Sequence, residues 1–216
     1  MKIKEPNILK ELNLVEDLLS LIYESREDET DIVNKHIKDT YLTQVDLSRL
    51  NFNGVIFENC RFIDCLFEGA SFIDVIFKTC DLSNSNFSDG YFNRCEFISN
   101  KWLGGNLQNN SFQQITIKNC NFQYANFDNT NLNHVYILES DMSDANLSNC
   151  KLKNMKLDNV KFTNASFFRT LLNRIDFTES HIGGISVSNE YTELEGAIVN
   201  IFQAADLAKL LGVVVK

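Results

Sequence analysis

The sequence predicts an all-β solenoid, a chain wound into stacked coils, and three observations support this fold class. From Leu42 to Val187 every fifth residue is large and apolar, thirty positions in a row without a slip of frame. Neither the helical period of about 3.6 residues nor the strand period of about 2 produces this spacing. The residue two places before each large one is mostly small or compact. Such a strict short repeat indicates units that bury their apolar side chains only by stacking on neighbours.

The overall composition narrows the class of protein. With 216 residues and 44% hydrophobic content, the chain can form one domain with an extended core. The net charge of −9 argues against a conventional nucleic-acid binder. No apolar run is long enough to span a membrane, and the N-terminal residues lack the features of a signal peptide. We therefore expect a cytoplasmic protein with no membrane partner.

The N-terminal segment, residues 1–38, is predicted to form a helical cap over the open end of the solenoid. Between residues 5 and 25 the apolar positions follow helical spacing, with Pro6 near the start of the expected helix. A highly charged turn follows, for which a solvated linker is the plainer interpretation. Ile32 and Ile37 already keep the five-residue frame, but Lys35 would then point into the interior, which leaves this stretch ambiguous.

The solenoid itself is expected over residues 39–188, with one large and one small inward side chain in each repeat. All six cysteines occupy the small inward position, which predicts buried, unreactive thiols. No Cys-x-x-Cys pair marks a metal site, so we expect neither a metal nor a cofactor. The six are Cys60, Cys65, Cys80, Cys95, Cys120 and Cys150.

Three stretches in this frame carry a recognisable pattern: Ala-Asn-Phe-Asp-Asn at 125–129, Ala-Asn-Leu-Ser-Asn at 145–149 and Ala-Ser-Phe at 165–167. They resemble the A-[DN]-[LF]-x-x consensus of the pentapeptide repeat family, and the resemblance covers about two-thirds of the chain. It implies a right-handed quadrilateral β-helix, in which four repeats form one square coil. At roughly 4.8 Å between stacked strands, the rod would be about 36 Å long.

Four faces per coil imply that residues twenty apart in the sequence stack on one another. An inward column of this kind is a continuous aromatic stack, and an outward column places amides where they can form an asparagine ladder. Another outward column largely alternates in the sign of its charge. The core-defining residues are Phe52, Phe72, Phe92, Phe112 and Trp102, the ladder is Asn109, Asn129 and Asn149, and the charged column begins with Arg61, Asp81 and Lys101.

One irregularity lies near the middle of the rod. Asn100 and Asn110 occupy small inward positions on either side of Trp102. A buried amide must find hydrogen-bond partners. We therefore expect either a local distortion or a satisfied internal hydrogen bond at this level.

The C-terminal segment, residues 189–216, is predicted to contain a helix over 203–211 that Gly212 ends, followed by a strand over 213–215. Leu-Glu-Gly-Ala-Ile-Val at 194–199 and the helix after it are similar to the tail of the quinolone-resistance (Qnr/MfpA-like) branch of the family. In that branch the tail forms a two-fold dimer, so the resemblance implies a homodimer. The candidate contacts are Phe202, Leu207, Leu210 and Leu211.

A search for catalytic residues finds none. The three histidines lie in unrelated repeats, and no zinc-protease, nucleophile-elbow, phosphate-loop or dinucleotide pattern is present. A rod filled by its own side chains also leaves no pocket. We therefore expect a non-enzymatic protein.

The resemblance implies a binding function instead. The Qnr-like branch is held to mimic duplex DNA, which would make DNA gyrase or topoisomerase IV the partner, with quinolone protection and no direct binding of nucleic acid. Residues 41–187 hold twelve basic and fifteen acidic side chains, a net charge of −3. About 36 Å of duplex DNA carries roughly 21 negative charges, so the electrostatic likeness is poor. Only the first half leans negative, through Asp64, Glu68, Asp74, Asp81, Asp89 and Glu96.

Two alternatives stay open at this point. The rod can be a structural or protein-interaction scaffold with no topoisomerase role, recognised by its shape or by its N-terminal helix. An enzyme or small-ligand protein is the weaker alternative, because it needs a pocket that the repeat does not provide.

Overall fold

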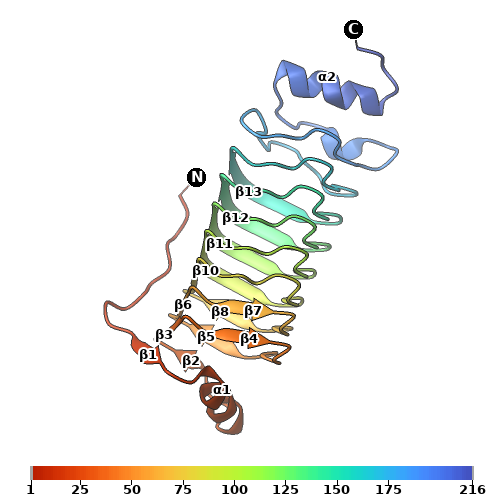
Figure 1. Ribbon diagram of the computed structural model, residues 1–216. Helices are drawn as coiled ribbons and strands as arrows, with labels where there is room; N and C mark the ends of the chain where they lie inside the picture. Colours follow the sequence, from red (N-terminus) through yellow and green to blue (C-terminus); the bar gives the residue numbers. More distant parts are fainter. Residues whose placement is uncertain (1, 216) are drawn as a thin grey trace.

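The computed structural model describes residues 2–215, and a right-handed quadrilateral β-helix of about seven turns dominates it (Figure 1). Within these residues all strand pairs are parallel, and paired residues in the coils from Ile32 onward lie twenty apart in the sequence, as Phe92 does opposite Phe112. The predicted solenoid is therefore confirmed, with four five-residue repeats in each coil.

Two adjacent faces of the coil carry most of the strands. In the first coils these strands are short: β2 (Ile32–Val33), β3 (Lys35–Lys38), β5 (Asn51–Asn53), β6 (Ile56–Glu58), β8 (Ser71–Ile73) and β9 (Ile76–Lys78). In later coils the two faces join into the eight-residue strands β10 (Tyr91–Ile98), β11 (Ser111–Lys118), β12 (Asn131–Leu138) and β13 (Lys151–Asp158). A third face holds the pair β4 (Tyr41–Thr43) and β7 (Arg61–Ile63), and elsewhere the coils meet through isolated bridges.

The corners of the square require a left-handed backbone conformation. The residue two places after the large one adopts it in nearly every repeat, with φ close to +55° at Asn59, Asp74 and Asn129 among others. Asn, Asp and Gly tolerate this conformation best, which explains their recurrence at these positions. At Gly54, where φ is +65°, an added Cβ would also lie 2.6 Å from Asn34 Oδ1.

The core consists of the large inward residues stacked in columns. The rings of Phe52 and Phe72 lie 5.1 Å apart, those of Phe72 and Phe92 4.7 Å, and those of Phe92 and Phe112 4.6 Å, all nearly parallel. Trp102 is fully buried, and its indole Nε1 is the one buried side-chain nitrogen or oxygen without a hydrogen-bond partner within residues 2–215. Stacking of this kind adds to the free energy of burying the rings.

The small inward positions bond to the backbone. The Cys95 thiol donates to Phe72 O at 3.3 Å, and burial raises the pKa of this thiol to about 12. At Asn100 the side chain accepts from Cys80 N–H at 2.7 Å and donates to Phe77 O at 2.8 Å. Asn110 likewise accepts from the backbone N–H of Gly90, so both amides are satisfied by internal hydrogen bonds and strand register continues undistorted past them.

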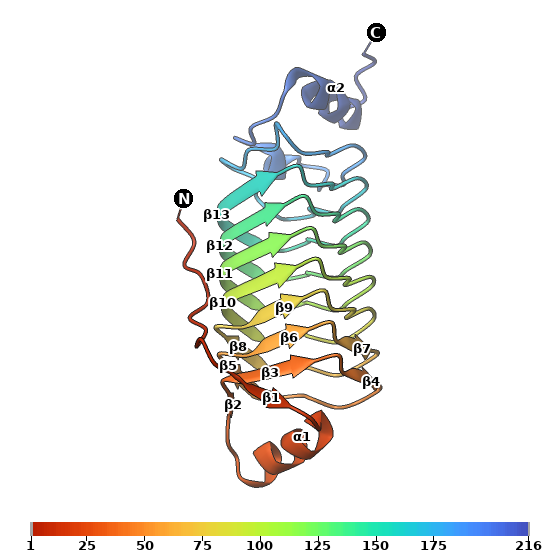
Figure 2. The ribbon, with the colours of Figure 1, turned by 60° about the vertical axis from the view of Figure 1, so that its left-hand side comes forward.

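The N-terminal helix is much shorter than expected. α1 (Leu18–Glu27) starts where the Asp17 carboxylate accepts hydrogen bonds from the first-turn backbone N–H groups. Residues 2–12 are not helical but extended, and they run along the outside of the rod before β1 (Asn13–Val15) pairs with β3 (Figure 2). Residues 32–38 are not part of a helical cap either, because β2 and β3 pair with β5 and β6 as the first coil.

The C-terminal end closes with a short 3-10 helix, η1 (Thr192–Leu194), and α2 (Ile201–Leu210). Asn200 and Gln203 form a capping box at the start of α2, and Gly212 follows its end with φ +76°. The predicted C-terminal helix is therefore confirmed, whereas the predicted strand over 213–215 is wrong, because these residues pair with no other strand. Neither helix in residues 2–215 has the length and apolar character needed to cross a lipid bilayer.

Candidate binding surface

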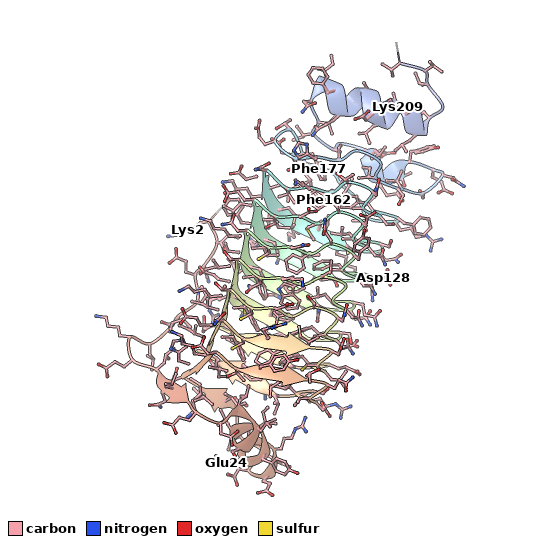
Figure 3. The ribbon with its side chains drawn as sticks, viewed as in Figure 1. Lys2, Glu24, Asp128, Phe162, Phe177 and Lys209 are labelled. Carbon is pink, nitrogen blue, oxygen red and sulfur yellow. The ribbon has the colours of Figure 1, made fainter. Side chains whose placement is uncertain are left out.

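The interior of the rod has no room for a ligand. Two small spaces among the apolar side chains of the rod measure about 10 Å³ each, room for one water at most. The side chains fill the coils up to the C-terminal cap, where Phe162 and Phe177 lie inside and Lys209 marks α2 beyond them (Figure 3). Any partner of this region must therefore contact the outer walls or the ends.

The six acidic residues singled out in the sequence do not form one surface. Asp81 stacks above β7, Glu68 lies on the neighbouring face beside the Leu66–Asn86 bridge, and Glu96 belongs to β10. Because the rod has four faces, these side chains point in different directions. A single partner surface cannot contact all six at once.

Asp74 has a structural role. Its carboxylate receives two hydrogen bonds of 2.6 Å from the Arg94 guanidinium and one of 2.9 Å from Asn7 N–H. Burial disfavours its charge, but these hydrogen bonds outweigh that effect and hold the pKa of Asp74 below its ordinary value. Asp81 is similarly engaged, 3.5 Å from Lys101 Nζ and accepting from Ser83.

The extended N-terminal segment covers part of the same wall. Lys4 N–H donates to Gln114 Oε1 at 3.0 Å, and Gln114 lies in β11, four coils above the first one. Burial and the nearby charge of Glu5 raise the pKa of Glu96, which places Glu96 beside this segment. Of the six acidic candidates, Asp64, Glu68 and Asp89 are exposed.

Amide ladders occupy much of the remaining wall. The Asn106 amide donates to Asn86 Oδ1 at 2.9 Å, and the Asn146 amide donates to Asn126 Oδ1 at 2.9 Å. The expected ladder is only partly present: Asn129 donates to Asn109 at 3.0 Å, but Asn149 turns to Asp128 instead. These neutral columns make the wall polar without making it strongly charged.

The C-terminal cap presents the most apolar exposed surface. Phe202 is 81% exposed and its neighbour Ile201 80%, which the sequence interpretation did not single out. Leu211 is also exposed, whereas Leu207 and Leu210 are half-buried. The cap is anchored by polar contacts, since the buried Gln203 amide donates to Phe177 O at 2.8 Å and Ser180 O at 2.7 Å.

A filled, square, parallel β-helix of five-residue repeats defines a solenoid repeat protein. The family model described as pentapeptide repeat region matches residues 70–146 and 111–187, together more than half of the chain. The chain belongs to the pentapeptide repeat family. No curated protein matches the sequence.

Solved structures share the fold at low sequence identity. HetL, a pentapeptide repeat protein involved in heterocyst differentiation regulation from the cyanobacterium Nostoc sp. strain PCC 7120, is 12% identical, with a TM-score of 0.51 over 85% of this chain and 93% of that one. Full-length QnrB1, a plasmid-mediated fluoroquinolone resistance protein, is 18% identical, with a TM-score of 0.48 over 84% and 92%. A trypsin-treated QnrB1 variant is 24% identical, with a TM-score of 0.47 over 84% and 90%.

Proposed function

We propose that this protein is a non-enzymatic, cytoplasmic binding rod that pairs with a second copy through its C-terminal cap and contacts a protein partner with its outer walls. The exposed pair Ile201 and Phe202 on α2 carries this proposal. Large apolar side chains that protrude from a well-capped helix are typical of a surface that another chain covers. A two-fold arrangement of two such caps would bury the same patch on both copies.

The candidate partner is DNA gyrase or topoisomerase IV. Support comes from the similarity of residues 194–199 and α2 to the tail of the Qnr/MfpA-like branch. The wall does not favour a copy of DNA by charge, because Asp74 and Asp81 are engaged in ion pairs. A topoisomerase would instead recognise the width of the rod together with local acidic groups such as Asp64, Glu68 and Asp89.

The function is tested with a gyrase supercoiling assay that contains a fluoroquinolone and increasing amounts of the protein. The proposal predicts recovery of supercoiling as the protein is added, and less recovery with the combined substitution Asp64→Asn, Glu68→Gln and Asp89→Asn. Neither protection nor inhibition at micromolar protein would exclude the topoisomerase and leave the scaffold interpretation.

Pairing through the cap is tested separately by light scattering. We expect a dimer mass for the wild type and a monomer mass for Phe202→Asp, since a carboxylate at the centre of an apolar interface would be desolvated without a partner. The matched control is Tyr124→Asp, which changes a 64% exposed aromatic residue on the wall. An unchanged mass for Phe202→Asp would remove the cap from the proposal.

A further inference from the structure

Backbone hydrogen bonding between successive coils is interrupted between β13 and the segment 171–178, which lies one coil later. In the coils below, the first N–H of this face donates to the preceding coil: Asn131 to Asn110 O at 2.9 Å and Lys151 to Thr130 O at 3.0 Å. The next member of the series, Leu171, makes no such bond among the described residues. No bridge joins β13 to segment 171–178, and β13 ends the order of the sheet.

Segment 171–178 is bonded to the end of the chain instead. Leu172 N–H donates to Glu193 O at 2.9 Å, and Phe177 N–H donates to Ile198 O at 2.9 Å. On the opposite side of the coil the ladder continues, with Phe162 N–H donating to His181 O at 2.7 Å. The interruption is therefore confined to two faces, and it leaves β13 as an edge strand of eight residues.

The apolar side chains of β13 are less completely covered at this edge than those of the coil below. Leu152 and Leu157 of β13 are partly buried, whereas Leu132 and Ile137, their counterparts one coil below, are each 1% exposed. The backbone N–H groups that would bond to the next coil have no backbone partner there. Bare edge groups beside apolar side chains are the features to which another strand binds.

The positive charge beside the edge of β13 favours an acidic strand as the binding partner. Lys151, Lys153 and Lys156 line β13 on the outside, and all three are exposed. None of them makes an ion pair within residues 2–215, and Lys156 Nζ instead lies 4.3 Å from the ring centre of Tyr136. Residues 151–187 hold six basic and three acidic side chains, in contrast to the negative chain as a whole.

We propose that the open edge of β13 docks an extended acidic peptide segment of another protein, which adds to it as a parallel strand. Acidic residues would lie opposite the three lysines, and apolar residues opposite Leu152 and Leu157. Glycine or asparagine would lie opposite Asn154, because this corner requires a positive φ, +53° in Asn154 itself. Addition breaks no ladder bond, since segment 171–178 is paired on its other side.

The direct test is fluorescence anisotropy with a labelled peptide built to this pattern, Glu-Ile-Glu-Gly-Val-Glu-Ile-Thr. We expect saturable binding that weakens as salt is added. The control peptide, with lysine in place of each glutamate, should not bind. Absence of binding by the acidic peptide at saturating protein would overturn the proposal.

Two variants locate the binding site. Reversing Lys151, Lys153 and Lys156 to Glu should weaken binding about tenfold, the loss expected of three exposed ion pairs. The matched control Lys161→Glu changes an exposed lysine of the next repeat, on a different face, and should leave binding within about twofold. Equal losses in both variants would show diffuse attraction rather than docking at this edge.

Hydrogen exchange of the wild type tests the open edge itself and needs no variant. The amides of Leu152, Asn154 and Leu157 should exchange faster than those of Leu132 and Ile137, and the bound peptide should protect them. If these amides are protected in the free protein as well as those of the coil below, β13 is hydrogen-bonded to segment 171–178. This result would also overturn the proposal.

Discussion

The two ends of the rod carry helices of equal length that attach in opposite ways. α1 buries the apolar side chains Leu18 and Ile22, each 4% exposed, and thereby covers the first coil. α2 buries only one side chain, the polar Gln203, and presents Ile201 and Phe202 to solvent. Both helices have ten residues and a side-chain cap, so neither length nor capping explains the difference.

The difference shows which end is closed by apolar side chains of its own chain. An end that is closed by apolar burial gains most of its free energy within one chain. The C-terminal end is anchored mainly by amide hydrogen bonds and keeps its apolar side chains Ile201 and Phe202 exposed, as the proposed pairing of two copies requires. Tyr23 of α1 is also exposed, at 72%, but its hydroxyl gives this ring a polar end that suits water.

The largest expected effect on stability comes from a substitution in the middle of the rod, and the effects at the two ends can be compared with it. We expect Phe92→Ala to lower the free energy of unfolding by about 3–5 kcal/mol, because Phe92 is fully buried between two stacked rings. Chemical denaturation measures this change. Phe168→Ala, at a ring 40% exposed on the wall, is the matched control and should cost far less. Similar losses in both variants would contradict the assigned register.

The second-largest loss of stability is expected at the N-terminal end, which α1 covers. Ile22→Ala should lower the free energy of unfolding by about 2–4 kcal/mol, since the helix end of a rod can relax more than its middle. Leu19→Ala removes a side chain of the same size from the same helix, but from a position 48% exposed, and should change stability by about 0.5 kcal/mol or less. Denaturation curves that cannot distinguish the two variants would mean that α1 does not seal the first coil.

Acidification should also destabilise the C-terminal end of the rod. Glu193 is buried beneath α2; burial opposes its charge, but hydrogen bonds from Arg169 N–H and from Ser188 outweigh this and lower its pKa. A lowered folded-state pKa contributes stability that is present above the ordinary value of 4.5 and is lost as the pH falls through the folded value. Wild type should therefore lose more stability than Glu193→Gln below about pH 4. Equal pH profiles would contradict this role of Glu193.

The coils were predictable from the sequence because their cause is local and repeated. Each large residue at a spacing of five can be buried only by its neighbours, and Phe52 to Phe112 stack as that spacing requires. The corner conformation was equally visible, since Gly54, Asn59 and Asp64 recur two places after the large residue. The start of α1 also had a signal, because Asp17 followed by Ser20 is a typical helix cap.

The surfaces were not predictable in the same way, because they depend on competition between distant segments. Leu172 and Phe177 keep the five-residue frame, so nothing local shows that their segment bonds to residues 193–198 rather than to β13. Asp74 likewise lies at a sequence position where an exposed acidic side chain is expected. Its structural role depends on hydrogen bonds from Asn7 and Arg94, which are distant in the sequence. A repeat sequence defines its coils better than it defines what lies against them.

The smallest expected effect on folding gives the sharpest test of the comparison between the two ends. Phe202→Ala should change the free energy of unfolding of the dilute monomer by about 0.5 kcal/mol or less, because the ring is 81% exposed and has little contact to lose. At higher concentration the wild type should unfold at a higher temperature, since association stabilises the folded state, and the variant should show no such dependence. If Phe202→Ala lowers the free energy of unfolding of the dilute monomer as much as Ile22→Ala does, then Phe202 packs against its own chain and holds α2 in place. The two ends would then be closed in the same way.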